Sequence, residues 1–531
     1  MSDVSDWSHG YVTDVLYTDN SYRELSPAWL NYVAAAQGCL PRPLDRPFTY
    51  VELGCGLGRT STHLAAAFPH AQFIGVDFNP AHIDSAQRYA AELGLSNVRF
   101  LERGFEDLVG EGNARALDLP EVDFIVLHGV YSWISPAARQ AVQRFIYERL
   151  KPGGLVYNSY NCLPGWTAEA PLRRLMVELG RTRAGSSETR IGHALDQMAE
   201  LGKFDLGFLN RQPAAKNALQ QYRTRPANYL AHEMLNADWN LFYSADVADE
   251  MAAAKLDFLG SATLPENQTD LILPDEAATF MRGQPDMRLR QLMQDFLLNQ
   301  RFRRDVFVRG HAHLPPLQVQ RNNDSQIVLA IKSLAKLDPK VKVPRGTANM
   351  DPKLLAALDA VLKNGTASVL ELGRKASTTG RPGDLARVVG ILLAANALMP
   401  AARVFRAAKG FQPDGQLRIP AEVNRRLLTR AATPEDAAGK SRPLVSSALG
   451  GILPIGLLHA ILLQCLTEAA GLDLAITKTL QVMARLGVNL RKDDKTLTEP
   501  AAKLAHLTEL AQAFIEQELP VLMAAGIVEA V

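Results

Sequence analysis

From residue 48 to about residue 159, the chain alternates between short apolar runs and segments whose apolar residues recur with helical spacing. The runs have the length of buried strands, and the segments between them, such as residues 59–68, have the period of amphipathic helices. Asn79 followed by Pro80 marks the start of one helix, since asparagine caps helices and proline is favoured at the first position. Strands that alternate with crossover helices predict an α/β fold with a parallel, doubly wound sheet. The five predicted strands are residues 48–53, 73–76, 98–101, 122–127 and 155–159.

Beyond Trp166 the pattern becomes helical, and a β-branched run returns only at residues 258–264. This order predicts a helical insertion within the α/β domain, after which the sheet resumes. The charged stretch at residues 302–310 predicts a basic turn whose side chains form internal ion pairs. The predicted helices of the insertion are residues 171–183, 190–202 and 214–222.

The C-terminal half is predicted to be mainly α-helical. Residues 314–316 (Leu-Pro-Pro) indicate a linker, and three short helices are predicted after it. A unit of that size fits a winged helix, and a further helical region follows residue 401. The three short helices are residues 351–362, 366–376 and 383–397.

Composition excludes several classes of protein. The 531 residues are 47% hydrophobic and 21% charged, which is ordinary for about two to four globular domains. A net charge of +1 gives no overall field that would hold a polyanion or an anionic membrane. The four cysteines form no C-x-x-C pair, and the acidic N-terminus lacks a signal peptide, so we expect a reducing, cytoplasmic location. The apolar stretch at residues 450–466 is too short and too polar to span a bilayer, and predicts a buried helix.

The most informative stretch is a glycine-rich turn after the first predicted strand, at residues 52–58 (ELGCGLG). Glycines permit positive φ and close approach of a ligand, and the helix that follows offers unpaired N–H groups. Dinucleotide sites use the spacing G-x-G-x-x-G, but residue 59 is arginine here, which weakens an NAD interpretation. Asp77 lies 19 residues after Gly58 at the end of the second strand, where a carboxylate can accept both hydroxyls of a ribose.

The Glu-x-Gly-x-Gly-x-Gly motif, followed by Phe-Ile-Gly-Val-Asp at residues 73–77, resembles the class I S-adenosylmethionine-dependent methyltransferases. The resemblance implies a Rossmann-like fold with S-adenosyl-L-methionine as cofactor; no metal is expected. It also implies that Glu52 helps to hold the methionine end, that the glycines approach the cofactor, and that Asp77 takes the ribose. Residues after the second and third strands are expected around the adenine. The expected cofactor-binding residues are Glu52, Gly54, Gly56, Gly58, Asp77, Phe78, Asn79, Phe105, Glu106 and His128.

Two aromatic-rich loops follow the fourth and fifth predicted strands, at residues 128–133 and 159–166. Ligands of open α/β sheets bind outside the carboxyl ends of the strands, so these loops are placed to receive a methyl acceptor. The alternative is that the tryptophans are core aromatics. The expected acceptor-site residues from these loops are His128, Tyr131, Trp133, Tyr160, Asn161 and Trp166.

A further candidate pair, His232 and Glu233, lies in the insertion. The pair begins like the zinc motif H-E-x-x-H, but residue 236 is asparagine, so the second metal ligand is missing. Glu233 either faces the substrate or pairs with an arginine such as Arg223 or Arg225. His128 or Glu233 could accept the proton released by an acceptor amine.

A wider set of segments resembles a narrower group: bacterial methyltransferases with a methyltransferase regulatory domain, which include protein-lysine methyltransferases of outer-membrane proteins. The resemblance implies a protein substrate, such as an outer-membrane protein before export, and a homodimer. The sequence carries no strong signal for nucleic-acid binding, and no membrane span is expected. The segments are residues 7–11, 22–27, 128–133, 160–166, 232–236 and 302–305. The expected domains are an N-terminal helical cap over the active site (1–45), a cofactor-binding core (46–165), a helical insertion for dimerisation and substrate (166–245), the remainder of the sheet (246–312), a middle domain (313–400) and a helical C-terminal domain (401–531).

Three functions follow from these expectations. The first is methyl transfer to lysine side chains of a protein by in-line displacement. The second is methyl transfer to a small molecule, which a closed cavity of drug size would favour. The third is a cofactor-binding regulator that contacts nucleic acid through the winged-helix-sized unit, for which steep salt dependence of binding would be expected.

Overall fold

A computed structural model describes residues 10–531, except 16–19, 110–118, 205–206, 311–313, 377–381, 409, 412–414, 432–440, 470 and 494. Residues 7–9 of the segment 7–11, which carries part of the family resemblance, therefore lie outside the described residues. No helix in the described part of the chain is both long and apolar enough to cross a membrane.

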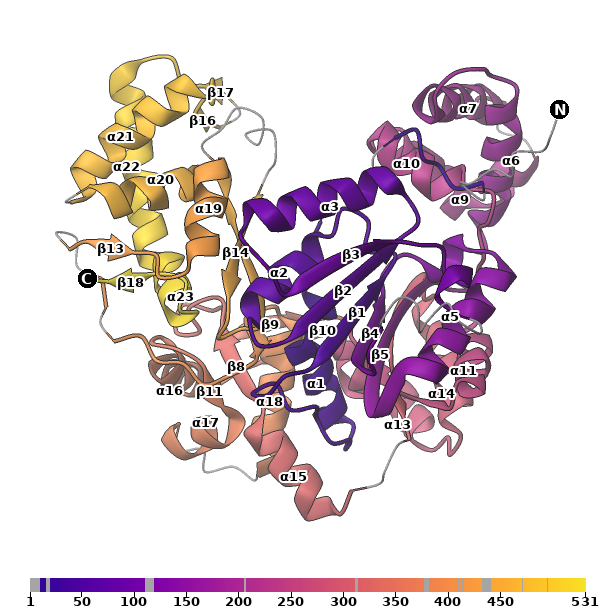
Figure 1. The fold of residues 1–531 in the computed structure, drawn as a ribbon, viewed down its shortest axis with the longest axis horizontal. Coiled ribbons are helices and arrows are strands. Elements are labelled where there is room, and N and C mark those ends of the chain that lie inside the picture. Colours follow the sequence, from indigo (N-terminus) through magenta and orange to yellow (C-terminus); the bar gives the residue numbers. More distant parts are fainter. Residues whose placement is uncertain are drawn as a thin grey trace.

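A seven-stranded mixed sheet forms the centre of the molecule, in the order β3-β2-β1-β4-β5-β7-β6 (Figure 1). The first five strands are parallel, as the alternating pattern predicts, and the Rossmann-like doubly wound fold is confirmed. The strands are β1 (Thr49–Leu53), β2 (Gln72–Asp77), β3 (Val98–Glu102), β4 (Val122–Leu127), β5 (Leu150–Asn161), β6 (Leu256–Ser261) and β7 (Phe302–Arg309).

Strand β7 corrects the sequence prediction, which expected a basic turn at residues 302–310. It lies between β5 and β6 and is antiparallel to both, with Asn161 paired to Phe302 and Leu155 to Val308. Three consecutive charged residues, 303–305, hid the strand pattern. The predicted internal ion pairs are present and are described below.

Side chains alternate between the two faces of the sheet, and the central strands β1 and β4 are buried on both faces, whereas the edge strand β3 is partly exposed. Tyr50 and Phe124 pack on the face that carries α1 and α2, and Val51 and Ile125 pack on the opposite face against α5 and α11. The helices and 3-10 turns around the sheet are η1 (Arg23–Leu25), α1 (Pro27–Ala36), α2 (Arg59–Ala67), α3 (Pro80–Glu92), η2 (Glu106–Leu108), η3 (Tyr131–Trp133), α5 (Pro136–Arg149), α11 (Ser244–Ala253), η4 (Leu264–Asn267), α12 (Thr269–Ile272), α13 (Asp275–Arg282) and α14 (Met287–Leu298).

The helical insertion lies between β5 and β6 in the chain and forms a separate bundle with its own core. Met176, Ile191 and Leu219 are buried in that core together with Trp166, which lies in the turn between β5 and α6. Figure 1 shows the insertion and helices α19–α22 on opposite flanks of the sheet, with α3 between them. The helices of the insertion are α6 (Ala170–Arg181), α7 (Ser187–Gly202), α8 (Gly207–Arg211), α9 (Pro213–Tyr222) and α10 (Ala227–Met234).

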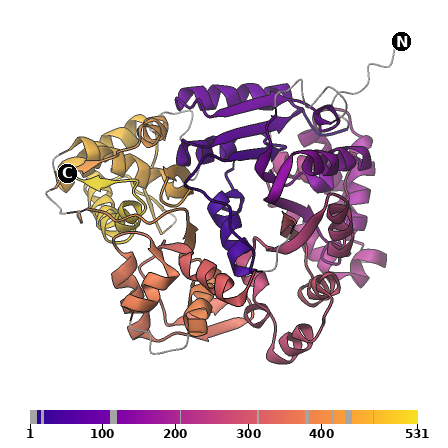
Figure 2. The same cartoon turned by 60° about the horizontal axis from the view of Figure 1, so that its bottom comes forward.

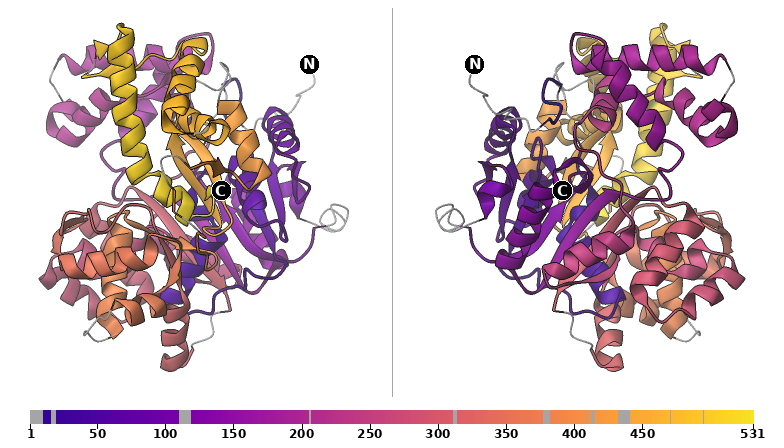
Figure 3. Two further views of the ribbon diagram at one scale, coloured as in Figure 1. Left: turned by 90° about the vertical axis from the view of Figure 1, so that its left-hand side faces the viewer. Right: turned by 90° about the vertical axis from the view of Figure 1, so that its right-hand side faces the viewer.

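The segment after the sheet contains the three predicted short helices and strands that the sequence prediction missed. A three-stranded antiparallel sheet, β11-β8-β12, and a hairpin, β9-β10, accompany α16–α18. This part lies beside α1 (Figure 2) and at the opposite end of the molecule from the insertion (Figure 3). Its elements are α15 (Pro316–Ser325), β8 (Ile327–Ala330), β9 (Lys340–Val343), β10 (Gly346–Asn349), α16 (Pro352–Leu362), β11 (Ala367–Ser368), α17 (Val369–Lys375), α18 (Pro382–Ala394) and β12 (Leu398–Ala401).

The last part of the chain is mainly helical and carries three short hairpins or strand pairs. The predicted buried helix at residues 450–466 is half correct, because residues 451–456 form a strand and the helix begins at Leu457. The elements are β13 (Leu417–Arg418), α19 (Glu422–Ala431), β14 (Ser441–Ser446), β15 (Gly451–Gly456), α20 (Leu457–Glu468), α21 (Leu472–Arg485), β16 (Arg491–Lys492), β17 (Lys495–Thr496), α22 (Pro500–Gln517), α23 (Leu519–Ala524) and β18 (Glu529–Ala530).

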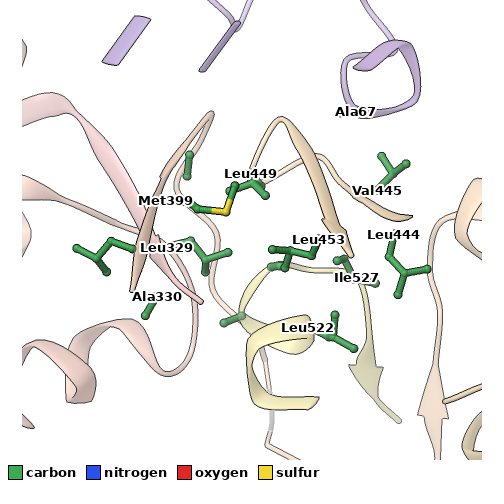
Figure 4. Packing of buried hydrophobic residues seen from close by; sticks show 14 of the residues in the cluster. Ala67, Leu329, Ala330, Met399, Leu444, Val445, Leu449, Leu453, Leu522 and Ile527 are labelled. Carbon is green, nitrogen blue, oxygen red and sulfur yellow. The ribbon is translucent and has the colours of Figure 1, made fainter. Parts of the chain in front are cut away.

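One hydrophobic core joins the two C-terminal parts to the central sheet. Figure 4 shows Leu329, Met399, Leu453 and Leu522 packed together, with Ala67 of α2 nearby. Because the shared core is continuous, the C-terminal half packs as an integral part of the central sheet's support rather than as a tethered module.

A buried ion network stabilises the pairing of β5 with β7. Arg303 donates to Asp295 at 2.5 Å and to both carboxylate oxygens of Asp305 at 3.0 Å, and Tyr160 donates to Asp305 at 2.5 Å. Arg303 and both aspartates are at most 2% exposed. Burial raises the pKa of Asp305 to about 6, an effect that Arg303 opposes. Arg303 is therefore the countercharge that allows two carboxylates to remain ionised inside the protein.

We expect Arg303→Met to lower the free energy of unfolding by about 3–5 kcal/mol, since it leaves buried carboxylates without a cation. The measurement is the denaturant midpoint. Arg288→Met is the matched control, because the Arg288–Asp249 pair has a similar 2.5 Å contact on the surface and its loss should leave the midpoint unchanged. Equal midpoints for the two variants would show that the network does not carry this stability.

Candidate active site

Two cavities meet at the carboxyl ends of the parallel strands, where His128, Gly129 and Trp133 line both of them. The first, of about 330 Å³, lies over the glycine turn after β1 and the end of β2. The second, of about 490 Å³, lies between the ends of β4 and β5 and the insertion. We call them the cofactor cavity and the acceptor cavity.

The three glycines of the turn have positive φ but different tasks. A Cβ on Gly54 would lie 2.4 Å from Val130, and one on Gly58 would lie 2.6 Å from Ala86 and Phe100. These two glycines allow close packing inside the protein. A Cβ on Gly56 would meet no protein atom within 4 Å, and Gly56 lines the cofactor cavity. Gly56 is thus the position at which the backbone is open to a ligand.

The Asp77 carboxylate connects the glycine turn to the start of α3. It accepts the N–H of Gly56 at 2.9 Å and the N–H of Asn79 at 3.0 Å, and lies 3.3 Å from the ring nitrogen of His82. Asp77 also lines the cofactor cavity, so the same group shapes the loop and faces the ligand space. This position fits the predicted role as acceptor for ribose hydroxyls.

Three predicted cofactor residues, Glu52, Gly58 and Asn79, do not line the cavity. The buried Glu52 carboxylate accepts the Ser61 N–H and hydroxyl, and burial raises its pKa to about 7. Asn79 caps α3 by accepting the N–H of Ala81 at 2.9 Å. Glu52 therefore stabilises the first turn of α2, and Asn79 stabilises the first turn of α3.

The other predicted cofactor residues, Phe78, Phe105, Glu106 and His128, line the cavity together with Tyr11, which was not predicted as a site residue. Tyr11 lies edge-on to Phe78 with ring centroids 5.8 Å apart. It reaches the cavity from a short segment, residues 10–15, that we call the N-terminal strap.

The N-terminal strap is fastened to the insertion. Gly10 accepts the N–H of Ala237 at 2.9 Å, and Val12 donates to the Asn236 side chain at 2.8 Å. The Asp14 carboxylate accepts the N–H and hydroxyl of Ser187, at 2.8 and 2.7 Å, at the start of α7. One segment therefore contacts both the cofactor cavity and the insertion.

Six of the predicted acceptor residues line the acceptor cavity: His128, Trp133, Tyr160, Asn161, Trp166 and Glu233. Aromatic residues from distant parts of the chain complete the wall, namely Tyr22, Tyr222, Tyr229 and Phe302. Of these, Tyr22 and Phe302 belong to segments that carried the family resemblance. Tyr229 begins the stretch of the insertion that contains the candidate pair His232–Glu233, and for Tyr222 the signal was its place at the end of the predicted helix 214–222.

Two predicted acceptor residues, Tyr131 and His232, do not line either cavity, which corrects their expected placement. Tyr131 is fully buried; its hydroxyl donates to Glu250 and accepts from Gln143 at 2.9 Å. The Nε2 atom of His232 lies 2.8 Å from the backbone carbonyl of Val15, so this ring supports the strap.

His128 is held rigidly at the junction of the cavities. Its Nδ1 atom lies 2.8 Å from the Tyr157 hydroxyl, and its ring lies 3.8 Å from that of Tyr22, measured between centroids. Burial, aided by Arg304, lowers its pKa to about 3. His128 is therefore neutral and a weak base at physiological pH, and it is better suited to shaping the junction than to accepting a proton.

Glu233 is the carboxylate of the acceptor cavity that has no cationic partner among the described residues. Neither Arg223 nor Arg225 forms an ion pair with it in the part of the chain that the structure covers, so that alternative is not supported. Burial raises its pKa to about 7, and an interaction with the Asn161 side chain offsets part of this rise. The second carboxylate, Glu169, is bound by Arg301 at 2.8 Å and by the Tyr222 hydroxyl.

Fold and cavities together define a class of protein, the Rossmann-like methyltransferases. A family model described as a methyltransferase domain matches residues 51–156, and one described as a predicted methyltransferase regulatory domain matches residues 226–309. An uncharacterized protein of Synechocystis, sll1526, is 35% identical over 526 residues, which cover 98% of this chain and 99% of the relative. The chain therefore belongs to the family of methyltransferases that carry this regulatory domain.

Two further comparisons involve Rickettsia proteins. An uncharacterized protein of Rickettsia prowazekii, RP789, is 26% identical over 308 residues, 56% of this chain and 52% of that protein. The structure of PKMT2 from Rickettsia typhi in complex with AdoHcy has a TM-score of 0.70 at 17% identity and covers 96% of this chain and 99% of PKMT2. This likeness shows that the complete fold, including the C-terminal half, is shared.

S-adenosyl-L-methionine is the cofactor of this family, and the cofactor cavity fits it. Gly56 leaves backbone open to the ligand, Asp77 offers carboxylate oxygens, and Phe78 and Phe105 offer aromatic surface. The carboxylate and the aromatic surface match, respectively, the hydroxyl-bearing ribose and the flat adenine.

We expect Gly56→Ala and Gly58→Ala to separate binding from stability. Both substitutions meet positive φ, but the new methyl group enters the cofactor cavity only at residue 56. Gly56→Ala should weaken S-adenosylhomocysteine binding by about tenfold or more, measured by calorimetry, because a well-packed ligand tolerates little overlap. Gly58→Ala should lower the free energy of unfolding by about 1–3 kcal/mol through overpacking against Phe100.

Equal effects of the two substitutions on affinity and on the unfolding midpoint would contradict this division of tasks.

Proposed function

We propose that the protein transfers methyl groups to lysine side-chain amines of a protein substrate. The observation that carries the proposal is Glu233, a carboxylate without a cationic partner in the described structure, inside an aromatic cavity that adjoins the cofactor cavity. An amine that enters this cavity finds one negative charge and aromatic faces, which together attract an ammonium group. The family resemblance and the fold shared with PKMT2 support the same substrate class.

The chain has to present a neutral amine at the junction of the cavities. S-adenosylmethionine supplies a methyl group bonded to a sulfonium sulfur. A lysine of pKa about 10.4 has to lose its proton at pH 7, at a cost of about 4.6 kcal/mol. Trp133, Tyr160 and Tyr229 remove water from the amine, which lowers its pKa.

Glu233 is the group that can accept the proton. Its raised pKa of about 7 lies close to the working pH, which is where a general base is most effective. His128, with a pKa of about 3, is far less basic. Tyr160 has a different role, since its hydroxyl is bound to Asp305, and it serves as a fixed wall of the cavity.

A small-molecule acceptor is the second candidate function. The acceptor cavity of about 490 Å³ lies within the size range of small-molecule sites, about 300–1,000 Å³, which favours this reading independently. The remaining parts of the proposal, a homodimer in the cytoplasm and an outer-membrane protein as substrate before its export, are carried by the family resemblance.

The test of Glu233 is a pH profile. A carboxyl group with a raised pKa becomes protonated as the pH falls through about 7, so kcat/KM of the wild type should fall below that pH. Glu233→Gln should reduce kcat/KM at pH 8 by about 100-fold and abolish the pH dependence near 7, while S-adenosylhomocysteine affinity stays unchanged. A Gln variant that keeps the pH dependence near 7 would assign it to another group.

The test of the substrate class is transfer of labelled methyl groups from S-adenosylmethionine into fractionated extract of the source cells. We expect label in protein that resists base, as methylated amines do, and that is lost with Asp77→Ala. Mass spectrometry should then place the methyl groups on lysine. Label found only in small molecules would favour the second function, and label only in nucleic acid would overturn both.

A further inference from the structure

The wall of the acceptor cavity carries an ordered series of side chains along helix α10 and the loop before it. Glu233 lies inside the cavity, Tyr229 lies one helical turn earlier, and Arg225 lies on the loop between α9 and α10. Two residues one turn apart share a helix face and are separated by about 6 Å along the axis. Burial raises the pKa of Tyr229 most, and both charged neighbours act on it as well, since Glu233 raises this pKa further and Arg225 lowers it. The series therefore leads from a negative interior to a positive mouth.

Arg225 is available to a ligand. Its side chain is exposed, it lines the cavity, and it forms no ion pair within the described ranges. The other arginine of the lining, Arg301, is bound to Glu169 and lies 3.7 Å from the ring centre of Trp166. Among the described residues that line the cavity, Glu233 inside it and Arg225 at its mouth are then the carboxylate and the guanidinium without an ion pair.

The segment of the chain that contains Arg225 is also positively charged. Residues 207–232 contain no aspartate or glutamate, and their four basic residues are Arg211, Lys216, Arg223 and Arg225. These residues belong to α8, α9 and the loop between α9 and α10, and Arg225 is the one of the four that lines the acceptor cavity. A substrate whose amine reaches Glu233 therefore meets Arg225, in a segment without acidic residues, and this favours negative charge beside the amine.

We propose that Arg225 selects the methylation site by binding a carboxylate side chain close in sequence or space to the acceptor lysine. This inference rests on the proposed lysine activity and names its substrate class: a protein segment in which the lysine is accompanied by aspartate or glutamate. The amine is directed to Glu233 inside the cavity, and the carboxylate stays at the mouth with Arg225. An isolated lysine within basic sequence is disfavoured, because its neighbours meet like charge.

The experiment compares three peptides of equal length whose central lysine is flanked by glutamate, glutamine or arginine, with wild-type full-length protein. Exposed charge pairs change binding by small factors, so kcat/KM for the glutamate peptide should exceed that for the glutamine peptide by about three- to fivefold at low salt. The arginine peptide should be slowest. The preference should decrease as salt is raised, since the Debye length falls to about 3 Å at 1 M.

Substitutions at Arg225 provide the specific test. Arg225→Gln should remove the preference for glutamate, and Arg225→Glu should reverse it in favour of the arginine peptide. Arg223→Gln is the matched control, because Arg223 is an exposed arginine two residues away that does not line the cavity. The control should retain most of the wild-type preference, and S-adenosylhomocysteine affinity should be the same in all four proteins.

The outcomes are distinguishable. If all three peptides are methylated equally, or if Arg223→Gln removes the preference as fully as Arg225→Gln does, the inference about Arg225 is overturned while the lysine activity stands. If free lysine is methylated as efficiently as the glutamate peptide, Arg225 binds the α-carboxylate of an amino acid, and the protein-segment proposal is wrong. Methylation of none of these compounds, with cofactor bound, would overturn the proposed function itself.

Discussion

A single guanidinium placed between two buried carboxylates holds together the two neighbouring strands, β5 and β7, that line the acceptor cavity. Arg303 of β7 joins Asp305 of its own strand to Asp295 of α14, and Tyr160 of β5 adds a hydrogen bond to the same cluster. In an interior of low dielectric, these charges are tolerable only together. These contacts fix strand β7 beside β5. They thereby also fix the positions of the residues that the two strands contribute to the acceptor cavity.

The direction of β7 explains why residues so far apart in the chain share one site. In a parallel sheet the strand ends that carry ligands all lie on one side, and a further parallel strand would place its beginning on the opposite side. Because β7 is antiparallel, its first residue, Phe302, pairs with Asn161 at the end of β5. Arg301 and Phe302 thereby reach the acceptor cavity from a segment that follows the whole insertion.

Most of the cofactor half of the site was predictable from sequence because its signals are local, although Tyr11 was missed and Glu52, Gly58 and Asn79 lie outside the cavity lining. A strand, a glycine turn and an acid at the next strand end specify their own geometry, and Gly54, Gly56 and Asp77 lie as expected. The acceptor half was predictable only in part. Tyr131 and Tyr160 look equivalent as aromatic residues after strands, but packing on Glu250 removes Tyr131 from the cavity, and local sequence does not encode that contact. Strand β7 was mistaken for a turn because the charges that hide its pattern are neutralised by residues of α14 and by one another.

The N-terminal strap makes exchange of the cofactor and placement of the insertion a single equilibrium. Tyr11 covers part of the cofactor cavity, and Asp14, three residues later, is bound to the first turn of α7. A segment this short cannot lift from the cavity and keep its hold on the helix at full strength. The position of the insertion and the shape of the cofactor cavity are therefore coupled through the strap, so a change at one is transmitted to the other.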